Sequence, residues 1–256
     1  MEYVFQTPMR LYFVMPFIRG GELYKHFLTS KRFPEEVVKF YAYQIALAIG
    51  HLHSKDIIHR DLKLENILVD EEGYLKIIDF GLAKILKEEE TTDTFCGTPE
   101  YLAPEMVSQR GHDKNVDWWA LGVLVYELLV GVSPFYNRNR NVMLSKIKAS
   151  RVVFPDPKKF KISISEECKD FICKLLDKKP TRRLGHSGGI DDIIQHPWFA
   201  VVNKEEILNK EIIPPFRPDL NDELDTKYFN AQDHLEALTE TMIPEPQQKE
   251  IQMKND

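Results

Sequence analysis

Cysteine is scarce in this chain of 256 residues. The three cysteines, Cys96, Cys168 and Cys173, are too few and too irregularly spaced for a disulfide framework or a metal knuckle. Long apolar runs are also lacking, because none approaches the roughly 20 residues that a membrane-spanning helix needs. The segment Met1–Tyr3 does not begin a signal peptide. These absences favour a cytoplasmic, intracellular protein without a membrane span.

The chain also lacks a strong excess of charge of one sign. The chain carries 34 basic and 40 acidic residues, so its formal net charge is −6. This balance gives no reason to expect nucleic acid as a partner and slightly favours cationic partners. Hydrophobic residues at 43% and charged residues at 29% are ordinary for a globular protein with a sizeable core. The function must therefore be sought in the motifs.

What the chain does have is a dense cluster of chemical groups at His59–Asn66, directly before the apolar run Ile67–Val69. The run predicts a short strand, so the cluster lies on the loop that precedes it. Asp61 could accept a proton from a hydroxyl, Asn66 could offer an oxygen to a metal ion, and Lys63 between them could neutralise charge. That set points to phosphoryl transfer, although any one of these residues alone is better explained by a charged surface loop.

Three further motifs follow in order. Asp79-Phe80-Gly81 comes after a turn and a second apolar run, and Gly97-Thr98-Pro99-Glu100 and Ala103-Pro104-Glu105 come after it. In order and spacing, the four motifs resemble the signature set of the eukaryotic serine/threonine protein kinases. The resemblance implies an α+β fold that consists mainly of the helical large (C-terminal) lobe of a kinase, with a remnant of the small-lobe sheet and a C-terminal tail.

Helical patterns support this fold class. The segments 22–29 and 34–53 carry apolar residues three and four positions apart, and 142–150 and 165–176 have the pattern of shorter amphipathic helices. The segment 116–129 is apolar nearly all round, which predicts a central, buried helix.

The resemblance implies two buried polar contacts. Asp117, at the start of the central helix, would accept backbone N–H groups of the catalytic loop. Arg183 would form a buried ion pair with Glu105. His51 and His53 point apart on their helix, so we interpret them as structural residues and not as metal ligands.

On this interpretation the chain has four parts. They are residues 1–15, two short strands left from the small-lobe sheet; 16–21, the hinge; 22–212, the large lobe; and 213–256, a C-terminal extension, loose at its end. The proline-rich composition of the extension alone is typical of a disordered linker. Two patches, Pro214–Pro218 and Asp225–Phe229, resemble the extension that wraps around the catalytic domain in the AGC group of kinases.

The resemblance also implies roles for individual residues. Asp61 is implied as the catalytic base, Lys63 as the residue that steadies the transferred phosphoryl group, and both Asn66 and Asp79 as ligands of Mg²⁺. Asn66 thereby joins Asp61 and Lys63 in the catalytic set. The implied cofactors are ATP and Mg²⁺. The residues implied at the nucleotide are Met15, Pro16, Ile18, Glu65, Leu68 and Asp79, with the backbone of the hinge facing adenine and Leu68 beneath it.

Substrate preference follows from the same resemblance. Lys63 in the catalytic loop and Thr98 in the loop that seats the acceptor favour serine or threonine over tyrosine as the target. Glu22, Glu65 and Glu127 match three acids that receive arginines upstream of the target in basophilic kinases. Each of these glutamates alone is more often a solvated side chain. The expected partners are protein substrates with basic motifs.

A regulatory residue is implied as well. Thr94, three residues before Gly97, matches the activation-loop phosphorylation site of the resemblance. A phosphate there adds a charge of about −1.5 to −2, with which Arg60 and Lys84 could pair. An upstream activating kinase is then a further expected partner.

Part of the kinase pattern has no counterpart in the 256 residues. There is no Gly-rich phosphate loop, no strand lysine and no matching helix glutamate, so we expect a kinase that lacks most of its N-terminal lobe. The predicted function is ATP-dependent transfer of the γ-phosphoryl group to serine or threonine of protein substrates, regulated by activation-loop phosphorylation. The alternative is a catalytically weak or inactive lobe that acts as a binding or regulatory module. An unrelated helical scaffold would leave all four motifs unexplained.

Overall fold

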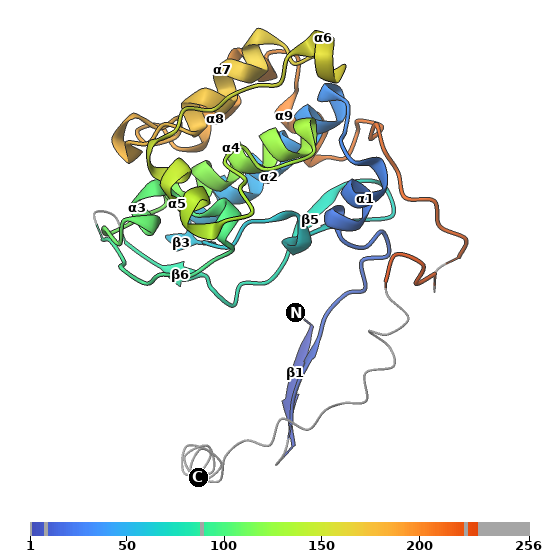
Figure 1. Ribbon diagram of the computed structural model, residues 1–256. Coiled ribbons are helices and arrows are strands. Elements are labelled where there is room, and N and C mark those ends of the chain that lie inside the picture. The colour runs from blue at the N-terminus through green and yellow to red at the C-terminus, as the bar shows by residue number, and fades with distance from the viewer. Residues whose placement is uncertain (1, 8–9, 88–89, 223–224, 230–256) are drawn as a thin grey trace, which may run out of the picture. The chain divides into compact units, whose positions relative to one another are not determined.

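The computed structural model describes residues 2–7, 10–87, 90–222 and 225–229 (Figure 1). It divides the chain into two compact units, one formed by Met1–Arg19 with Leu220–Asp256 and the other by Gly20–Asp219. Helices and small sheets together confirm the predicted α+β class. The last predicted part of the extension, 249–256, lies outside the described residues.

The first unit contains one hairpin. Its strands are β1 (Tyr3–Gln6) and β2 (Leu11–Val14), which pair antiparallel with Tyr3 opposite Val14. The two short strands that the sequence predicted within residues 1–15 are therefore confirmed. In the same unit the ring of Phe17 lies 4.9 Å from that of Phe229, centroid to centroid, so the second tail patch packs against the N-terminal segment.

The second unit is mainly helical. Its α-helices are α1 (Leu23–Ser30), α2 (Glu35–His53), α3 (Pro104–Val107), α4 (Asn115–Val130), α5 (Arg140–Ala149), α6 (Pro157–Phe160), α7 (Glu166–Leu175), α8 (Ile190–Ile194) and α9 (Lys204–Leu208). Its 3₁₀ turns are η1 (Leu64–Asn66), η2 (Pro99–Tyr101), η3 (Pro180–Arg182) and η4 (Pro197–Phe199). The five helices predicted from periodicity are confirmed to within about two residues at each end, and α8 is the short helix that the kinase resemblance implied at 190–195. The short helices α3, α6 and α9 were not predicted, because four or five residues carry no periodic signal.

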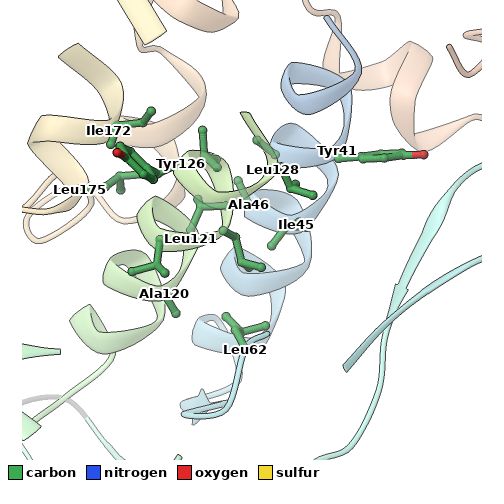
Figure 2. Packing of buried hydrophobic residues seen from close by; sticks show 14 of the residues in the cluster. Tyr41, Ile45, Ala46, Leu62, Ala120, Leu121, Tyr126, Leu128, Ile172 and Leu175 are labelled. Carbon is green, nitrogen blue, oxygen red and sulfur yellow. The ribbon is translucent and has the colours of Figure 1, made fainter. Parts of the chain in front are cut away.

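Helix α4 is the centre of this unit. Trp118, Trp119 and Leu121 are fully buried, as the all-round apolar pattern predicted. Helix α2 packs along one side of α4 and α7 along another. Figure 2 shows Ile45 of α2 and Leu121 of α4 meeting in this core. A helix that is apolar on every face must be enclosed, so the other helices are arranged around it.

A small hairpin follows the catalytic loop. Its strands β4 (Ile67–Val69) and β5 (Leu75–Ile77) pair antiparallel with Ile67 opposite Ile77, as the two apolar runs predicted. The carboxylate of Asp70 accepts the backbone N–H of Tyr74 at 2.8 Å and closes the turn. Gly73 has φ +97°, and a Cβ there would lie 2.2 Å from the carbonyl oxygen of Phe216, so only glycine fits.

A second pair of strands was not predicted. Strands β3 (Ile57–Ile58) and β6 (Lys84–Ile85) are antiparallel, with Ile57 opposite Ile85. Each has only two residues, which is too short for an alternating pattern to be visible in the sequence. The pairing ties the segment before His59 to the segment after Gly81, so both ends of the catalytic region are held.

Two long-range contacts complete the second unit. The guanidinium of Arg183 binds both carboxylate oxygens of Glu105, at 2.7 and 3.0 Å, and the arginine side chain is fully buried, which confirms the predicted ion pair. In the first tail patch, the ring of Phe216 contacts His26 and Phe33, with centroids 4.9 and 6.3 Å apart. That patch therefore packs against the helical unit, as the resemblance implied. Among the described residues, every helix is too short or too polar to cross a bilayer.

The ion pair yields a prediction about stability. Arg183→Met should lower the free energy of unfolding by about 3–5 kcal/mol, because it leaves the buried carboxylate of Glu105 without its counter-charge. The matched control is Arg182→Met, since Arg182 is 66% exposed and binds Asp177 at 2.9 Å, where the loss should stay below about 1 kcal/mol. Urea unfolding of both variants measures the difference. A loss at Arg183 no larger than at Arg182 would contradict this account.

Candidate active site

The loop that carries Asp61 is held by the carboxylate of Asp117. Its oxygens accept the backbone N–H groups of His59 at 3.0 Å and Arg60 at 2.9 Å, and one lies 2.8 Å from Nε2 of His53. Arg60 adopts a left-handed backbone conformation with φ 67°, which these bonds hold in place. Burial alone would raise the pKa of Asp117, but the bonds from His53 and the two N–H groups lower it. Both predictions, for Asp117 and for a structural His53, are confirmed.

Asp61 is buried, and its carboxylate is fully engaged. One oxygen accepts the backbone N–H and the hydroxyl of Thr98, both at 3.0 Å. The other lies 2.9 Å from the ammonium of Lys63 and 3.1 Å from the amide nitrogen of Asn66. Lys63 also donates to the Thr98 hydroxyl at 3.2 Å. Four of the predicted site residues therefore meet at one point.

The contact between the two loops depends on Gly97. Its φ is +102°, and a Cβ at this position would lie 2.9 Å from the carbonyl oxygen of Arg60. Only glycine combines this conformation with such a close approach of two backbones. Gly97 therefore allows Thr98 to reach Asp61, although the two residues are 37 positions apart in sequence.

Asn66 and Asp79 lie at the same end of the β4–β5 hairpin. The carbonyl oxygen of Asn66 accepts the backbone N–H of Ile78 at 2.9 Å, so Asp79 follows directly. The amide nitrogen of Asn66 donates twice to Asp61, to its carbonyl and its carboxylate, and no described residue forms a hydrogen bond with the amide oxygen. Asp79 is exposed, and its carboxylate accepts only the N–H of Gly81 at 3.0 Å among the described residues.

These two oxygen donors suit a hard cation. Mg²⁺ is usually held by one or two protein oxygens together with phosphates and water. The rest of the described chain offers no group of three or more histidine, cysteine, aspartate or glutamate side chains that could hold a metal ion. Asn66 and Asp79 are therefore the candidates for Mg²⁺ in this part of the chain.

The residues predicted at the nucleotide fall into both units. Leu68 lies on β4, is half-buried, and forms a backbone bridge with Glu22 at the start of α1. Met15, Pro16 and Ile18 belong to the first unit, where Met15 is exposed and Ile18 is buried. Their part in a nucleotide site stays a prediction.

Two of the three predicted substrate glutamates, Glu65 and Glu127, interact through their negative charges. The hydroxyl of Tyr101 donates a short hydrogen bond to the carboxylate of Glu127. Burial raises the pKa of Glu127 to about 7, the bond from Tyr101 opposes this, and the negative charges of Glu65 and Glu100 add to the rise. Glu22 directly precedes α1, which packs against the turn η1 that contains Glu65. The region is thus crowded with acids, and Glu127 carries a proton much of the time at neutral pH.

The predicted regulatory residues are linked through Thr92. Lys84 donates to its hydroxyl at 2.8 Å, and this hydroxyl lies 3.3 Å from the hydroxyl of Thr94, which is exposed. Arg60 uses its Nε to donate to the carbonyl of Leu82 at 2.7 Å, while its Nη1 is buried with no hydrogen-bond partner among the described residues. Part of this segment, 88–89, lies outside the described residues.

Sequence reasoning missed three residues of this region. Thr92 and His112 are buried and exchange two backbone hydrogen bonds, of 3.0 and 3.1 Å, and Tyr101 caps Glu127. Burial, and then the charge of Arg60, lower the pKa of His112. Nothing in the sequence pointed to the Thr92–His112 pair, because a single backbone bridge needs no special side chains. Tyr101 had one signal, its place directly after the motif that ends at Glu100.

Comparison with known proteins agrees with this geometry. A sequence model of the family described as the protein kinase domain matches residues 1–199. The chain belongs to the protein kinase family. Serine/threonine-protein kinase YPK1 of Saccharomyces cerevisiae is 41% identical over 253 residues, which are 98% of this chain and 36% of that protein. Serine/threonine-protein kinase sgk-1 of Caenorhabditis elegans is 43% identical over 233 residues, 91% of this chain and 49% of that protein.

A third relative places this kinase in the same group. The RAC serine/threonine-protein kinase of Drosophila melanogaster is 43% identical over 250 residues, 96% of this chain and 39% of that protein. By these likenesses the chain belongs with the serine/threonine protein kinases of the AGC group, as predicted. Protein kinases in general use ATP and Mg²⁺. The chain spans between about a third and a half of the length of the curated relatives it matches.

Proposed function

We propose that this chain transfers the γ-phosphoryl group of ATP to serine or threonine hydroxyls of proteins. The observation that supports it best is the convergence of Lys63, Asn66 and Thr98 on the carboxylate of Asp61. A charged surface loop has no reason to bury an aspartate among donors from two distant segments. A phosphoryl-transfer site needs such a group within reach of the acceptor hydroxyl.

Each residue at this point has a role in the proposal. Asp61 accepts the proton of the substrate hydroxyl as that oxygen attacks. Lys63, 2.9 Å from Asp61 and 3.2 Å from Thr98, steadies the negative charge of the group in transfer. Thr98 holds the carboxylate in orientation and lies where the acceptor would be seated. Positioning of this kind accounts for much of the rate in phosphoryl transfer.

The proposed cofactor is Mg²⁺ with ATP. Asn66 and Asp79 hold the cation in this proposal, because their free oxygens lie at one end of the hairpin. Bound there, the metal and the nucleotide supply the activated phosphoryl group and neutralise its charge. The proposed nucleotide contacts are those predicted from the sequence, namely Met15, Pro16, Ile18, Glu65 and Leu68 together with Asp79.

The proposed substrates carry basic residues upstream of the target. Glu65 and Glu127 crowd one another, and each would be relieved by an arginine. Glu22, directly before a helix that packs against the Glu65 turn, is the third acid of the proposed subsite. The partners on this proposal are protein substrates with basic motifs.

Phosphorylation of Thr94 by an upstream kinase is the proposed regulation. Thr94 is exposed, and the hydroxyl of Thr92 links it to Lys84. That hydroxyl lies 3.3 Å from the hydroxyl of Thr94 and 2.8 Å from the ammonium of Lys84. The Nη1 of Arg60, buried and without a hydrogen-bond partner in the described part of the chain, is a donor that a phosphate could satisfy. Such bonds would order the activation segment, which is the stretch between Gly81 and Ala103, beside the catalytic loop.

The central test concerns Asp61. Asp61→Asn keeps the shape of the side chain and removes its basicity, so transfer of labelled γ-phosphate to an arginine-rich serine peptide should fall at least about 100-fold. Mg²⁺·ATP binding by calorimetry should stay close to that of the parent. The control is Asp191→Asn, an exposed aspartate at the start of α8, which should leave transfer unchanged.

The same assay separates the proposal from its alternative. Near-normal transfer by Asp61→Asn would overturn the role of the base. If the parent chain is folded and binds Mg²⁺·ATP but shows no transfer, catalysis by this chain is ruled out. The function that then remains is the regulatory or binding module.

A pH prediction follows from Glu127. Its pKa of about 7 means that it is mostly protonated at pH 6 and mostly ionised at pH 8. Arginine stays charged over this range, so the Kd of an arginine-containing peptide should rise by up to about tenfold as the pH falls from 8 to 6. Glu127→Gln should remove most of this dependence. A peptide with alanine in place of the arginine corrects for other titrating groups, and equal pH profiles for the two peptides would refute the assignment.

Loss of Thr94 should lower activity. The reference is the parent chain after phosphorylation by an upstream kinase, as verified by mass spectrometry. Against this reference, Thr94→Ala treated in the same way should have a kcat lower by about tenfold or more, because one charge-assisted hydrogen bond contributes about 1.5–3 kcal/mol. Thr91→Ala changes an exposed threonine of the same segment and serves as the control. The switch proposal fails if Thr94→Ala is as active as the phosphorylated parent.

A further inference from the structure

A hollow of about 500 Å³ lies outside the site described above, among α3 with the residues that follow it, the end of α5 and the turn η3. Helices α3 and α5 pack against one another beside it (Figure 1). Its lining provides four cationic side chains and two hydroxyl groups. They belong to Arg110, Lys148, Lys178, Lys179, Ser108 and Thr181.

The positive charge of this hollow has little compensation. Arg110, Lys148 and Lys179 are exposed, and none of them has an ion pair with a described residue. The acid in the lining, Glu105, is committed to Arg183 through two hydrogen bonds. The chain as a whole has a net charge of −6, so the cluster runs against its overall charge. Such a local excess attracts anions.

The ammonium of Lys178, which lines the hollow, is held in place by its contacts. Its ammonium lies 3.7 Å from the centroid of the Phe135 ring and 4.7 Å from that of Trp119, and it donates to the carbonyl of Ile147 at 2.7 Å. Burial, and then the charge of Arg183, lower its pKa to about 7. The group is held in one place by aromatic rings and forms no ion pair among the described residues, although the charge of Asp177 partly opposes the fall of its pKa. An added anion gains most beside such a buried and weakly compensated cation.

We propose that this hollow binds a phosphorylated side chain of a partner protein. A phosphoserine carries nearly two negative charges and three acceptor oxygens, which matches a set of several cations and two hydroxyl donors. A carboxylate offers half the charge and one oxygen fewer. The volume of about 500 Å³ exceeds what a bare phosphate ion fills, so it has room for the residues that flank a phosphoserine. The site is separate from Asp61 and does not rest on the proposed function.

The test is a binding measurement on the full chain. The probe is a fluorescent nine-residue peptide with one phosphoserine among neutral residues, and anisotropy gives its Kd. The double variant Arg110→Ala/Lys179→Ala should weaken binding at least about tenfold, because it removes two charge-assisted contacts. Both side chains are exposed, so folding should be preserved. The matched control is Lys55→Ala/Arg138→Ala, which removes two exposed cations elsewhere and should leave the Kd unchanged.

A second readout addresses Lys178 directly. At pH 8 the phosphate is a dianion while Lys178 is mostly neutral, so binding should be accompanied by proton uptake. Calorimetry in two buffers of different ionisation enthalpy measures that uptake. Lys178→Met keeps an unbranched side chain between the two rings and should abolish it.

Three results would overturn the proposal. The first is equal affinity of the parent and the Arg110→Ala/Lys179→Ala variant. The second is equal binding of the same peptide without its phosphate. The third is complete displacement of the peptide by inorganic phosphate at an equal concentration, which would reduce the hollow to a site for small anions. Binding that requires the phosphate on the peptide and is lost in the double variant supports it.

Discussion

The carboxylate of Asp117 is the contact on which the site depends. Asp117 lies in the first turn of the central helix α4, and its carboxylate binds the backbone of His59 and Arg60, so the catalytic loop is tied to the centre of the core. A buried carboxylate without partners would be costly, and these N–H groups together with His53 satisfy it. The same bonds hold Arg60 in its left-handed conformation and direct the following residue, Asp61, toward the activation segment.

A second constraint, at Gly97, brings the activation segment to the catalytic loop. Gly97 lets the activation segment approach the backbone of Arg60, and Thr98 then closes on Asp61. The segment continues into α3, where Glu105 is bound by the buried Arg183. The geometry at Asp61 is thus fixed from two sides, by the central helix and by an ion pair that anchors the far end of the activation segment.

Much of this arrangement could be predicted because it depends on side-chain type. The apolar pattern on all faces of the central helix is visible in the residues themselves, whereas the contacts of Asp117 and of Glu105 with Arg183 were implied by the kinase resemblance. The pairings of β3 with β6 and of Thr92 with His112 are not visible, since backbone hydrogen bonds over one or two residues impose no pattern. The sequence could name the site residues, whereas their convergence depends on the hairpin register and on Gly97.

Burial shifts the pKa values of Glu127 and Lys178 in opposite directions. Burial is the largest cause in both cases, and it brings the pKa of the acid up to about 7 and that of the base down to about 7. Each group is therefore only partly charged in the free protein, which limits its repulsion from its own neighbours, Glu65 and Arg183. A ligand of opposite charge restores the ionised form and gains an interaction that was not present before binding. On our proposals an arginine would do this at Glu127 and a phosphate at Lys178, so each site would respond to its ligand most strongly near neutral pH.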